Sequence, residues 1–307
     1  MKGVILYNPY YYNDSVQTQA RRIAGELRAL GADVAIRPNA RTMFLSEKFG
    51  SDTAIEFCPP PDGGGAFPFG FAVFLDKDKY APRMLERRGV RVFNSAAAIE
   101  ACDDKMLTHI ALAAHGVAMP ETLPGLLCFD PAAAPDEGYC RFAADRLGFP
   151  LVVKECYGSM GKGVYLARDF KELLDIAERV KLSPHLFQRF VASSAGRDIR
   201  VMAVGGRAVA WMLRKSETDF RSNIDLGGKG YAVELEPPFR ALAERAARIL
   251  GLDYCGVDLL IGERGEPLLC EVNSNAFFAE LERVTGANVA GAYAGHIARA
   301  MRKQGKK

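Results

Sequence analysis

The sequence predicts an α/β protein with α+β lobes: an open parallel sheet first, a small flap lobe second and an antiparallel sheet last. Up to about residue 95, short apolar runs alternate with helical patterns, which is typical of a parallel sheet covered on both faces. Later strands are joined by short glycine-containing turns, as in antiparallel hairpins. A chain of 307 residues is long enough for such lobes. We expect them at 1–95, 96–187 and 188–307.

The first lobe is predicted from four apolar runs and the signals between them. Asp14 is expected to cap a helix from residue 15, with Gln17 as its capping-box partner and Gly31 ending it. A second helix should end near Arg88, and the proline- and glycine-rich stretch 58–69 predicts a loop. The expected strands are 4–7, 34–36, 71–75 and 90–93.

The two later lobes show longer strands and clearer helices. Residues 96–116 have helical spacing, and Pro120 prevents a helix from continuing past it. A hairpin is expected around Gly205 and Gly206, with strands at 199–204 and 208–214. The remaining expected elements are strands at 151–154, 163–167, 186–191, 255–261 and 268–272, and helices at 170–180, 239–250 and from about 289.

Composition excludes several classes of function. The net charge is +3, and the basic residues are spread along the chain except for the short tail Arg302, Lys303, Lys306 and Lys307, which we interpret as a frayed end, so no nucleic-acid partner is expected. No apolar stretch is long enough to span a bilayer. The seven cysteines include no CxxC pair, so neither a zinc site nor a disulfide framework is indicated. We therefore expect a cytoplasmic protein with reduced thiols and no membrane partner.

A cross-strand pair of acids is the sharpest chemical signal. Glu271 and Asn273 alternate on one face of a predicted strand. If Arg264 and Gly265 form a two-residue loop, Asp258 lies opposite Glu271, with Cβ atoms about 5 Å apart. An all-oxygen ligand set of this kind favours Mg²⁺ or Mn²⁺, with nucleotide phosphates completing the shell. The alternative is a solvated strand face, but Asp258 and Glu271 each interrupt a core-like strand.

A glycine-rich turn supplies a second signal. Gly158, Gly161 and Gly163 would let backbone N–H groups approach phosphate oxygens, although hairpin glycines commonly serve only the turn. The turn is not a Walker A loop, because Lys162 is not followed by Ser or Thr. Lys154 ends an apolar strand, where a charge calls for an anionic partner unless it reaches solvent.

Arginines provide a third signal. Arginine suits bidentate capture of carboxylate or phosphate, although arginines on strands are often only solvated. Beside a divalent-metal site they indicate stabilisers of a phosphoryl group and a substrate carboxylate. The four that cluster in sequence are Arg197, Arg200, Arg214 and Arg221.

Together these residues resemble the ATP-grasp ligases, and most closely the RimK-type group, which includes glutamate-adding ligases and lysine-biosynthesis carrier-protein ligases. The likeness runs from about residue 92 to the end and keeps its order. The matching segments are Phe93-Asn94-Ser95, Asp104-Lys105, Val152-Val153-Lys154, 158–163, 188–191, Gly196-Arg197-Asp198-Ile199-Arg200, Phe220-Arg221-Ser222-Asn223, Gly256-Val257-Asp258 and Glu271-Val272-Asn273-Ser274.

The resemblance implies a role for each candidate residue. Two lysines would bind the nucleotide phosphates beneath the flap, and the backbone near residue 189 would form the adenine hinge. The cofactor-binding residues implied are Lys105, Lys154, Gly158, Ser159, Gly161, Gly163, Gln188, Arg189, Phe190 and Asp198, the last near the ribose. Asp258, Glu271 and Asn273 would hold Mg²⁺, and Arg200, Arg214, Arg221 and Asn223 would serve the transferred phosphoryl group and the acceptor.

The sequence departs from the family in three places. Arg189 stands where an acidic hinge residue is common, and Asn275 begins a segment that replaces a Ser-Pro type. The first lobe matches only in fold. Its aromatic loop, Tyr10 to Tyr12, follows a strand's carboxyl end, where α/β sheets bind ligands. Substrate specificity and simple packing are both open for this loop.

The implied activity is an ATP- and Mg²⁺-dependent ligation of a carboxylate to an amine, such as glutamate, through an acyl phosphate. The substrates would be small molecules or a protein tail, and the resemblance favours a homo-oligomer. Two alternatives remain. An ATP-grasp phosphotransferase would phosphorylate a hydroxyl and release no free phosphate. A non-catalytic nucleotide-binding regulator would bind without turnover.

Overall fold

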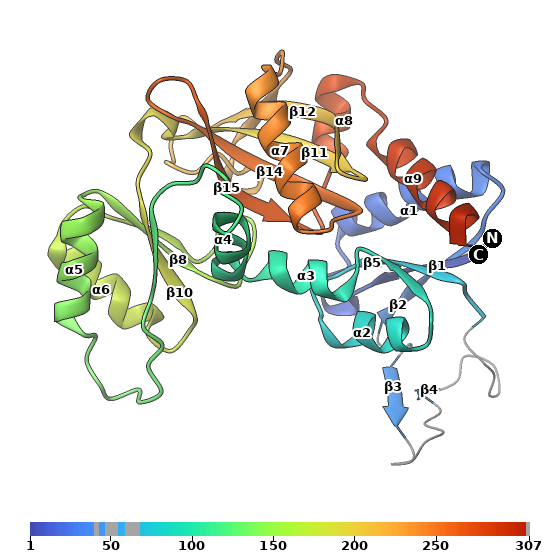
Figure 1. The fold of residues 1–307 in the computed structure, drawn as a ribbon, viewed down its shortest axis with the longest axis horizontal. Helices are drawn as coiled ribbons and strands as arrows, with labels where there is room; N and C mark the ends of the chain where they lie inside the picture. Colours follow the sequence, from blue (N-terminus) through green and yellow to red (C-terminus); the bar gives the residue numbers. More distant parts are fainter. Residues whose placement is uncertain (40–42, 47–54, 59–67, 305–307) are drawn as a thin grey trace.

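The computed structural model describes residues 1–39, 43–46, 55–58 and 68–304. These residues form three larger sheets and one two-stranded pair. Figure 1 shows the N-terminal sheet at one end, the five-stranded sheet in the centre and the remaining four-stranded sheet at the other end. Within this part of the chain, no helix combines the length and the apolarity that crossing a membrane requires.

The N-terminal sheet is parallel, with strand order β2-β1-β5-β6, and all four predicted strands are confirmed. In its middle strands, β5 is buried throughout and β1 is buried from Gly3 to Leu6, as expected for a sheet covered on both faces. Residues 59–67 of the predicted loop lie outside the described residues, and Cys58 ends a strand instead. The elements are β1 (Lys2–Tyr7), α1 (Asp14–Ala29), β2 (Asp33–Pro38), β3 (Met43–Ser46), β4 (Ile55–Cys58), β5 (Phe71–Leu75), α2 (Tyr80–Arg87) and β6 (Arg91–Phe93).

The predicted cap of α1 was wrong by one residue. The side chain of Asn13, not Asp14, accepts a hydrogen bond from the backbone N–H of Val16, and Asp14 is the first helical residue. Both Asn and Asp make good caps, so the sequence alone could not separate neighbours. The predicted end of the helix is confirmed, because Gly31 follows it with φ of +81°.

The middle sheet is antiparallel, with strand order β7-β10-β8-β9 and its own apolar core. Helices α5 and α6 lie together on one side of it (Figure 1). The proposed lobe boundary between residues 187 and 188 falls inside β10, so a division after Arg189 keeps this strand whole. The elements are β7 (Thr122–Pro124), α5 (Glu137–Leu147), β8 (Leu151–Glu155), β9 (Val164–Ala167), α6 (Phe170–Val180) and β10 (His185–Arg189).

The helical stretch predicted at 96–116 is two helices, α3 (Ala96–Asp103) and α4 (Lys105–Ala113). Asp104 separates them, with extended backbone angles and a side chain that accepts from the N–H groups of Met106 and Leu107. The break makes Lys105 the first residue of α4, so this lysine lies at a fixed point beside the middle sheet.

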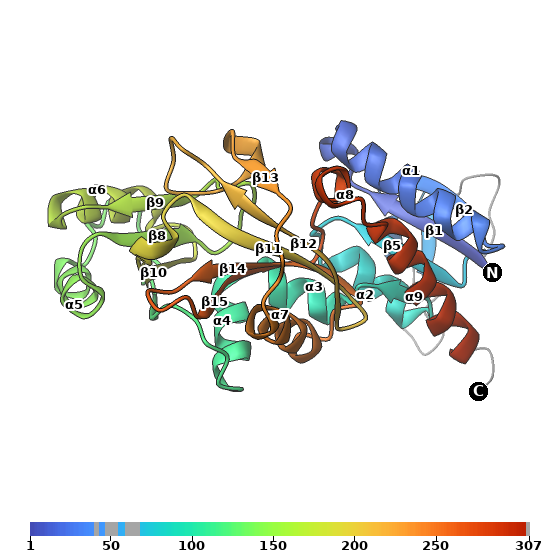
Figure 2. The same ribbon diagram turned by 90° about the horizontal axis from the view of Figure 1, so that it is seen from above.

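The C-terminal sheet is antiparallel, with strand order β13-β12-β11-β14-β15. Helix α7 contacts four of its strands, and α8 and α9 lie beside α1 of the first lobe (Figure 2). The elements are β11 (Arg197–Val204), β12 (Arg207–Lys215), β13 (Lys229–Tyr231), α7 (Pro237–Ile249), β14 (Tyr254–Ile261), β15 (Pro267–Asn273), α8 (Ala279–Thr285) and α9 (Val289–Gln304).

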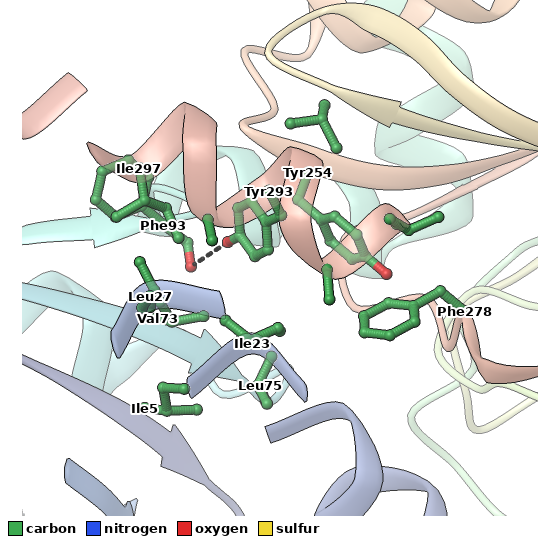
Figure 3. Close-up of a cluster of buried hydrophobic side chains, with 14 of the residues drawn as sticks. Ile5, Ile23, Leu27, Val73, Leu75, Phe93, Tyr254, Phe278, Tyr293 and Ile297 are labelled. Atoms are coloured by element: carbon green, nitrogen blue, oxygen red, sulfur yellow. Dashed lines mark hydrogen bonds between the residues drawn. The ribbon is translucent and has the colours of Figure 1, made fainter. Parts of the chain in front are cut away.

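The first and last lobes share one core. Tyr254 of β14 stacks on Tyr293 of α9 with ring centroids 4.7 Å apart, and the Tyr293 hydroxyl donates to the backbone oxygen of Phe93 at 3.2 Å (Figure 3). The buried amide of Asn94 donates to the backbone oxygens of Tyr254 and Ser274 at 2.7 and 2.9 Å. These contacts fix the carboxyl edge of the parallel sheet against the antiparallel sheet.

Candidate functional site

A cleft of about 810 Å³ lies between the middle and C-terminal sheets. This volume includes space that is open to solvent. The structure brings most of the predicted site residues to its walls: Lys105, Lys154, Gly158, Ser159, Gly161, Gln188, Arg189, Phe190, Asp198, Arg214, Arg221, Asn223, Asp258 and Glu271. Gly163, Arg200 and Asn273 do not line it.

Two buried lysines enter the cleft from different elements. The Lys105 ammonium group donates to the backbone oxygen of Gly158 at 3.1 Å and lies 3.8 Å from a carboxylate oxygen of Glu271. Lys154 is 8% exposed, and among the described residues its ammonium group makes one hydrogen bond, to the Cys270 sulfur at 3.5 Å, and no ion pair. A buried cation without a counter-charge is costly, so Lys154 favours an anionic ligand.

The lining as a whole carries more positive than negative charge. Seven basic and three acidic residues line the cleft. A positively charged, partly enclosed site attracts polyanions such as nucleotide phosphates. The basic residues are Lys105, Lys154, Lys162, Arg189, Arg197, Arg214 and Arg221, and the acids are Asp198, Asp258 and Glu271.

The positive charge of the cleft contributes to a lowered pKa of His109. Its ring lies behind the cleft, 3.2 Å from the side-chain nitrogen of Gln188. Burial, and then the charge of Lys154, lower the pKa of His109 to about 4. The imidazole is therefore neutral at pH 7 and adds no charge to the site.

An alternating network of acids and arginines forms the floor. Arg214 donates to Asp198 at 2.7 Å and lies 3.0 Å from Asp258, while Arg200 donates to Asp258 from the other side at 2.7 Å. Burial alone would raise the pKa of Asp258, but the charges of Arg200 and Arg214 outweigh burial and lower it. Asp258 is therefore held as a carboxylate, although Arg200 reaches the site only through it.

The predicted pairing of Asp258 with Glu271 is confirmed, but the predicted turn was wrong. The loop has three residues, because Gly262 pairs with Glu266 and Gly265 takes φ of +83°. A β-bulge offsets the extra loop residue, since the register shifts between Asp258 and Leu259. The sequence pattern gave no indication that a bulge would offset the longer loop.

The bulge also adds a residue to the cleft. Cys270 is the unpaired residue of the bulged strand, and both Cys270 and Glu271 line the cleft although they are adjacent in sequence. A strand without a bulge would place neighbouring side chains on opposite faces. Sequence reasoning therefore treated Cys270 as core, whereas its thiol contacts Lys154.

The oxygen ligands proposed for a metal fit a nucleotide-bound cation in part. Asp258 and Glu271 face each other on the cleft wall, while Asn273 pairs with Gly256 and lies off the lining. Within the described ranges, no three His, Cys, Asp or Glu side chains gather as a metal site of their own. Two carboxylates with phosphate oxygens suit Mg²⁺, which needs few protein ligands.

The hinge at residues 189–191 offers backbone and apolar contacts. The Arg189 guanidinium turns away to Glu121 at 2.8 Å and to the backbone oxygen of Leu147 at 2.9 Å. Phe190 meets Phe220 edge-on, with ring centroids 6.2 Å apart. This arrangement suits a planar base held by backbone groups.

Several lining residues were missed by sequence reasoning. Val152 could have been found, because it lies two residues before Lys154 and so shares its strand face. Leu260 could have been found in the same way, because it lies two residues after Asp258 on β14. Most of the others lie on loops or at the bulge, which periodicity does not reveal. They are Lys162, Val164, Val191, Ser194, Phe220, Ser222 and Cys270.

Two sheets that close on a basic cleft, with a glycine-rich flap beside it, define an ATP-grasp fold. A family model described as the RimK-like ATP-grasp domain matches residues 102–297. The chain belongs to this family.

Known proteins with similar sequences or structures are ligases and synthases. Beta-citrylglutamate synthase B of Homo sapiens is 40% identical over 228 residues, which cover 73% of this chain and 57% of that protein. A probable alpha-L-glutamate ligase of Maridesulfovibrio salexigens is 38% identical over 213 residues, 68% of this chain and 67% of that protein. D-alanine–D-alanine ligase from Bacillus anthracis, complexed with ATP, has a TM-score of 0.73 over 99% of both chains at 19% identity, which supports the fold alone. The chain spans between about half and two thirds of these curated relatives' length.

Proposed function

We propose that the chain is an ATP-dependent carboxylate–amine ligase that forms an amide through an acyl phosphate. The observation that carries the proposal is that one cleft contains both buried lysines and the cross-strand acid pair of Asp258 and Glu271. The positive charges of the lysines complement nucleotide phosphates. The carboxylates complement a divalent cation that is bound to those phosphates. Family membership supports the same chemistry.

In this proposal Asp258 and Glu271 would hold Mg²⁺ or Mn²⁺, and Asn273, which is on the strand of Glu271 but off the cleft lining, would be the third ligand. When bound, the cation would neutralise charge on the transferred phosphoryl group. Lys105 and Lys154 hold phosphate oxygens, Asp198 lies toward the ribose, and the backbone at Arg189 and Phe190 borders the base. Arg214, kept charged by its two carboxylate partners, and Asn223 face the reacting groups.

The flap formed by residues 158–163 excludes water in this scheme. An acyl phosphate hydrolyses readily, so an amine can capture it efficiently only where bulk water is kept out. Gly158 is already tied to Lys105 through its backbone oxygen, which links the flap to the phosphate site. No side chain of the enzyme needs to form a covalent bond.

The substrate class is suggested by the names of the relatives. Both curated relatives name glutamate in their products or activity, and one joins it to a citryl group. We propose glutamate as the amine and a small polycarboxylate as the donor, with a peptide tail as the other acceptor class. Six of the seven cysteines, Cys102, Cys128, Cys140, Cys156, Cys255 and Cys270, are free thiols, which supports a reducing cytosol as the site of action.

A phosphate-release assay with ATP, Mg²⁺, pooled carboxylates and pooled amino acids tests the proposal, with products read by mass. We expect phosphate release that requires both pools, and an amide product of glutamate. Asp258→Asn and Glu271→Gln should each reduce the rate at least about 100-fold, because each removes a ligand charge. Glu266→Gln, in the exposed turn of the same hairpin, is the matched control and should change little. Release of ADP without phosphate would indicate a phosphotransferase, and binding without turnover a regulator.

The assembly state and lobe division belong to the same proposal. We expect a homo-oligomer, which light scattering on the full chain measures directly. A monomer at working concentration would contradict the expected homo-oligomer and would leave the proposed ligase chemistry unaffected.

A further inference from the structure

We propose that Arg221 and Tyr11 are positioning residues that hold the flap, residues 158–163, closed over the cleft. The inference rests on the proposed function, in which the flap keeps water from the acyl phosphate. It assigns Arg221 a role other than direct contact with the transferred phosphoryl group.

The guanidinium of Arg221 is fully engaged. Nε and Nη2 donate to the two carboxylate oxygens of Asp219, at 2.9 and 2.7 Å. Nη1 donates to the backbone oxygen of Gly161 in the flap, at 2.6 Å. The hydrogen bonds to Asp219 raise the pKa of Arg221, and those from Arg221 lower the pKa of Asp219. Asp219 thus balances the charge of Arg221 and aims its remaining nitrogen at the flap.

Close packing at Gly161 is a second, independent observation. A Cβ atom on Gly161 would lie 2.7 Å from Leu226 Cδ1 and 3.1 Å from Asn223 Oδ1. Gly161 also has φ of +73°, a conformation that other residues rarely adopt. The flap therefore lies directly against the 219–226 segment, with no room for a side chain between them.

The N-terminal lobe contacts the flap as well. The Tyr11 hydroxyl donates to the sulfur of Met160 at 3.1 Å. At the base of the flap, the Lys79 ammonium group lies 5.8 Å from the ring centroid of Tyr157. The aromatic loop after β1, whose role the sequence left open, thus contacts the flap through Tyr11.

A loosened flap should uncouple the reaction. Water would then attack the acyl phosphate, giving back the free carboxylate and inorganic phosphate, so ATP is consumed without an amide. In the native chain, contacts from the first and last lobes oppose this opening from two sides. The loss of Arg221 should therefore change the ratio of phosphate released to amide formed more than it changes the affinity for the nucleotide.

Limited trypsin digestion of the full chain tests the contacts without any substrate. Lys162 lies exposed in the flap and is a natural cleavage site. We expect Arg221→Lys and Asp219→Asn to be cleaved after Lys162 about 5- to 10-fold faster than the native chain, and Tyr11→Phe about 2-fold faster. Arg264→Lys, in the exposed hairpin turn, is the matched control and should be cleaved at the native rate. Native-rate cleavage in both Arg221→Lys and Asp219→Asn, with folding verified by circular dichroism, would overturn the proposal.

The products of turnover separate the two roles of Arg221. If Arg221 positions the flap, Arg221→Lys should raise phosphate released per amide formed from near one to at least about 3, with the KM for ATP within about 2-fold. If Arg221 instead stabilises the phosphoryl group, kcat falls and the ratio stays near one. Since the digestion requires no substrate, failure of the proposed ligase function and failure of this proposal give different results.

Discussion

Charged side chains buried in the cleft each need a partner, because burial without one is costly. Asp258 has two arginines, and Glu271 has the nearby ammonium group of Lys105. Lys154 has only the thiol of Cys270 within the described residues. At the scale of single residues, the most deeply buried charges of the cleft therefore have partners of opposite charge except Lys154, which favours binding of an anion.

Replacing Lys154 by Met keeps most of the length of the side chain and removes its charge. We expect this variant to bind MgADP about 10- to 100-fold more weakly, since a hydrogen bond to a charged group contributes about 1.5–3 kcal/mol. Its thermal stability without ligand should be unchanged or higher, because an unpaired buried charge is gone. Calorimetric titration and thermal melting measure both. Unchanged nucleotide affinity would place the phosphates elsewhere.

His109 should make stability depend on pH. Its folded pKa is lowered to about 4 from an ordinary value of 6.5, so the unfolded chain binds the proton first as pH falls. The free energy of unfolding should then decrease from about pH 6.5 to pH 4, by on the order of 3 kcal/mol from this group. Urea unfolding of the native chain and of His109→Gln at several pH values measures the difference. An equal slope in both chains would contradict the assignment.

At the scale of elements, hydrophobic periodicity predicted most strands and the helices of strong pattern, such as α6 and α9. It missed α5, whose buried face consists mainly of Cys140, Ala143 and Ala144. These small residues differ little in hydrophobicity from the exposed face, so the helical period is weak. It also missed the bulge at Cys270, because a bulge arises from local backbone geometry rather than from residue type. The register at the acids was correct because loop and bulge errors cancelled.

Two glycine substitutions test the turn geometry. In Gly265→Ala the left-handed φ of +83° is strained, although no atom lies within 4 Å of the added Cβ, so we expect a loss of about 1 kcal/mol. Gly25→Ala, in the exposed face of α1 and equally free of neighbours, should gain about 0.5–1 kcal/mol. Chemical unfolding gives both values. The changes in the free energy of unfolding should have opposite signs. A gain in stability in both variants would contradict the left-handed conformation of Gly265.

At the scale of the whole molecule, α8 and α9 from the end of the chain complete the core of the first lobe. The sequence could not show this, since contacts such as Tyr293 with Phe93 join residues far apart in the chain. The resemblance to ATP-grasp ligases did predict that distant motifs would meet in one cleft. The middle sheet keeps a separate core and borders the C-terminal sheet across the cleft.

Hydrogen exchange should reveal this division. Residues 122–189 should exchange as one cooperative unit, and the first and last lobes together as another, because cores define the units that open. Adding a nonhydrolysable ATP analogue with Mg²⁺ should slow exchange in both units, at β8 and at β14. Equal protection of all sheets without nucleotide would contradict the two-core account.

The most direct test of an acyl phosphate in this cleft tracks oxygen atoms. With a carboxylate donor labelled with ¹⁸O and identified by the substrate screen, turnover with ATP and the amine should transfer one labelled oxygen from the carboxylate to each phosphate released. Mass spectrometry of the phosphate reads the transfer, and Asp258→Asn should abolish it. Amide formation with unlabelled phosphate would contradict the account.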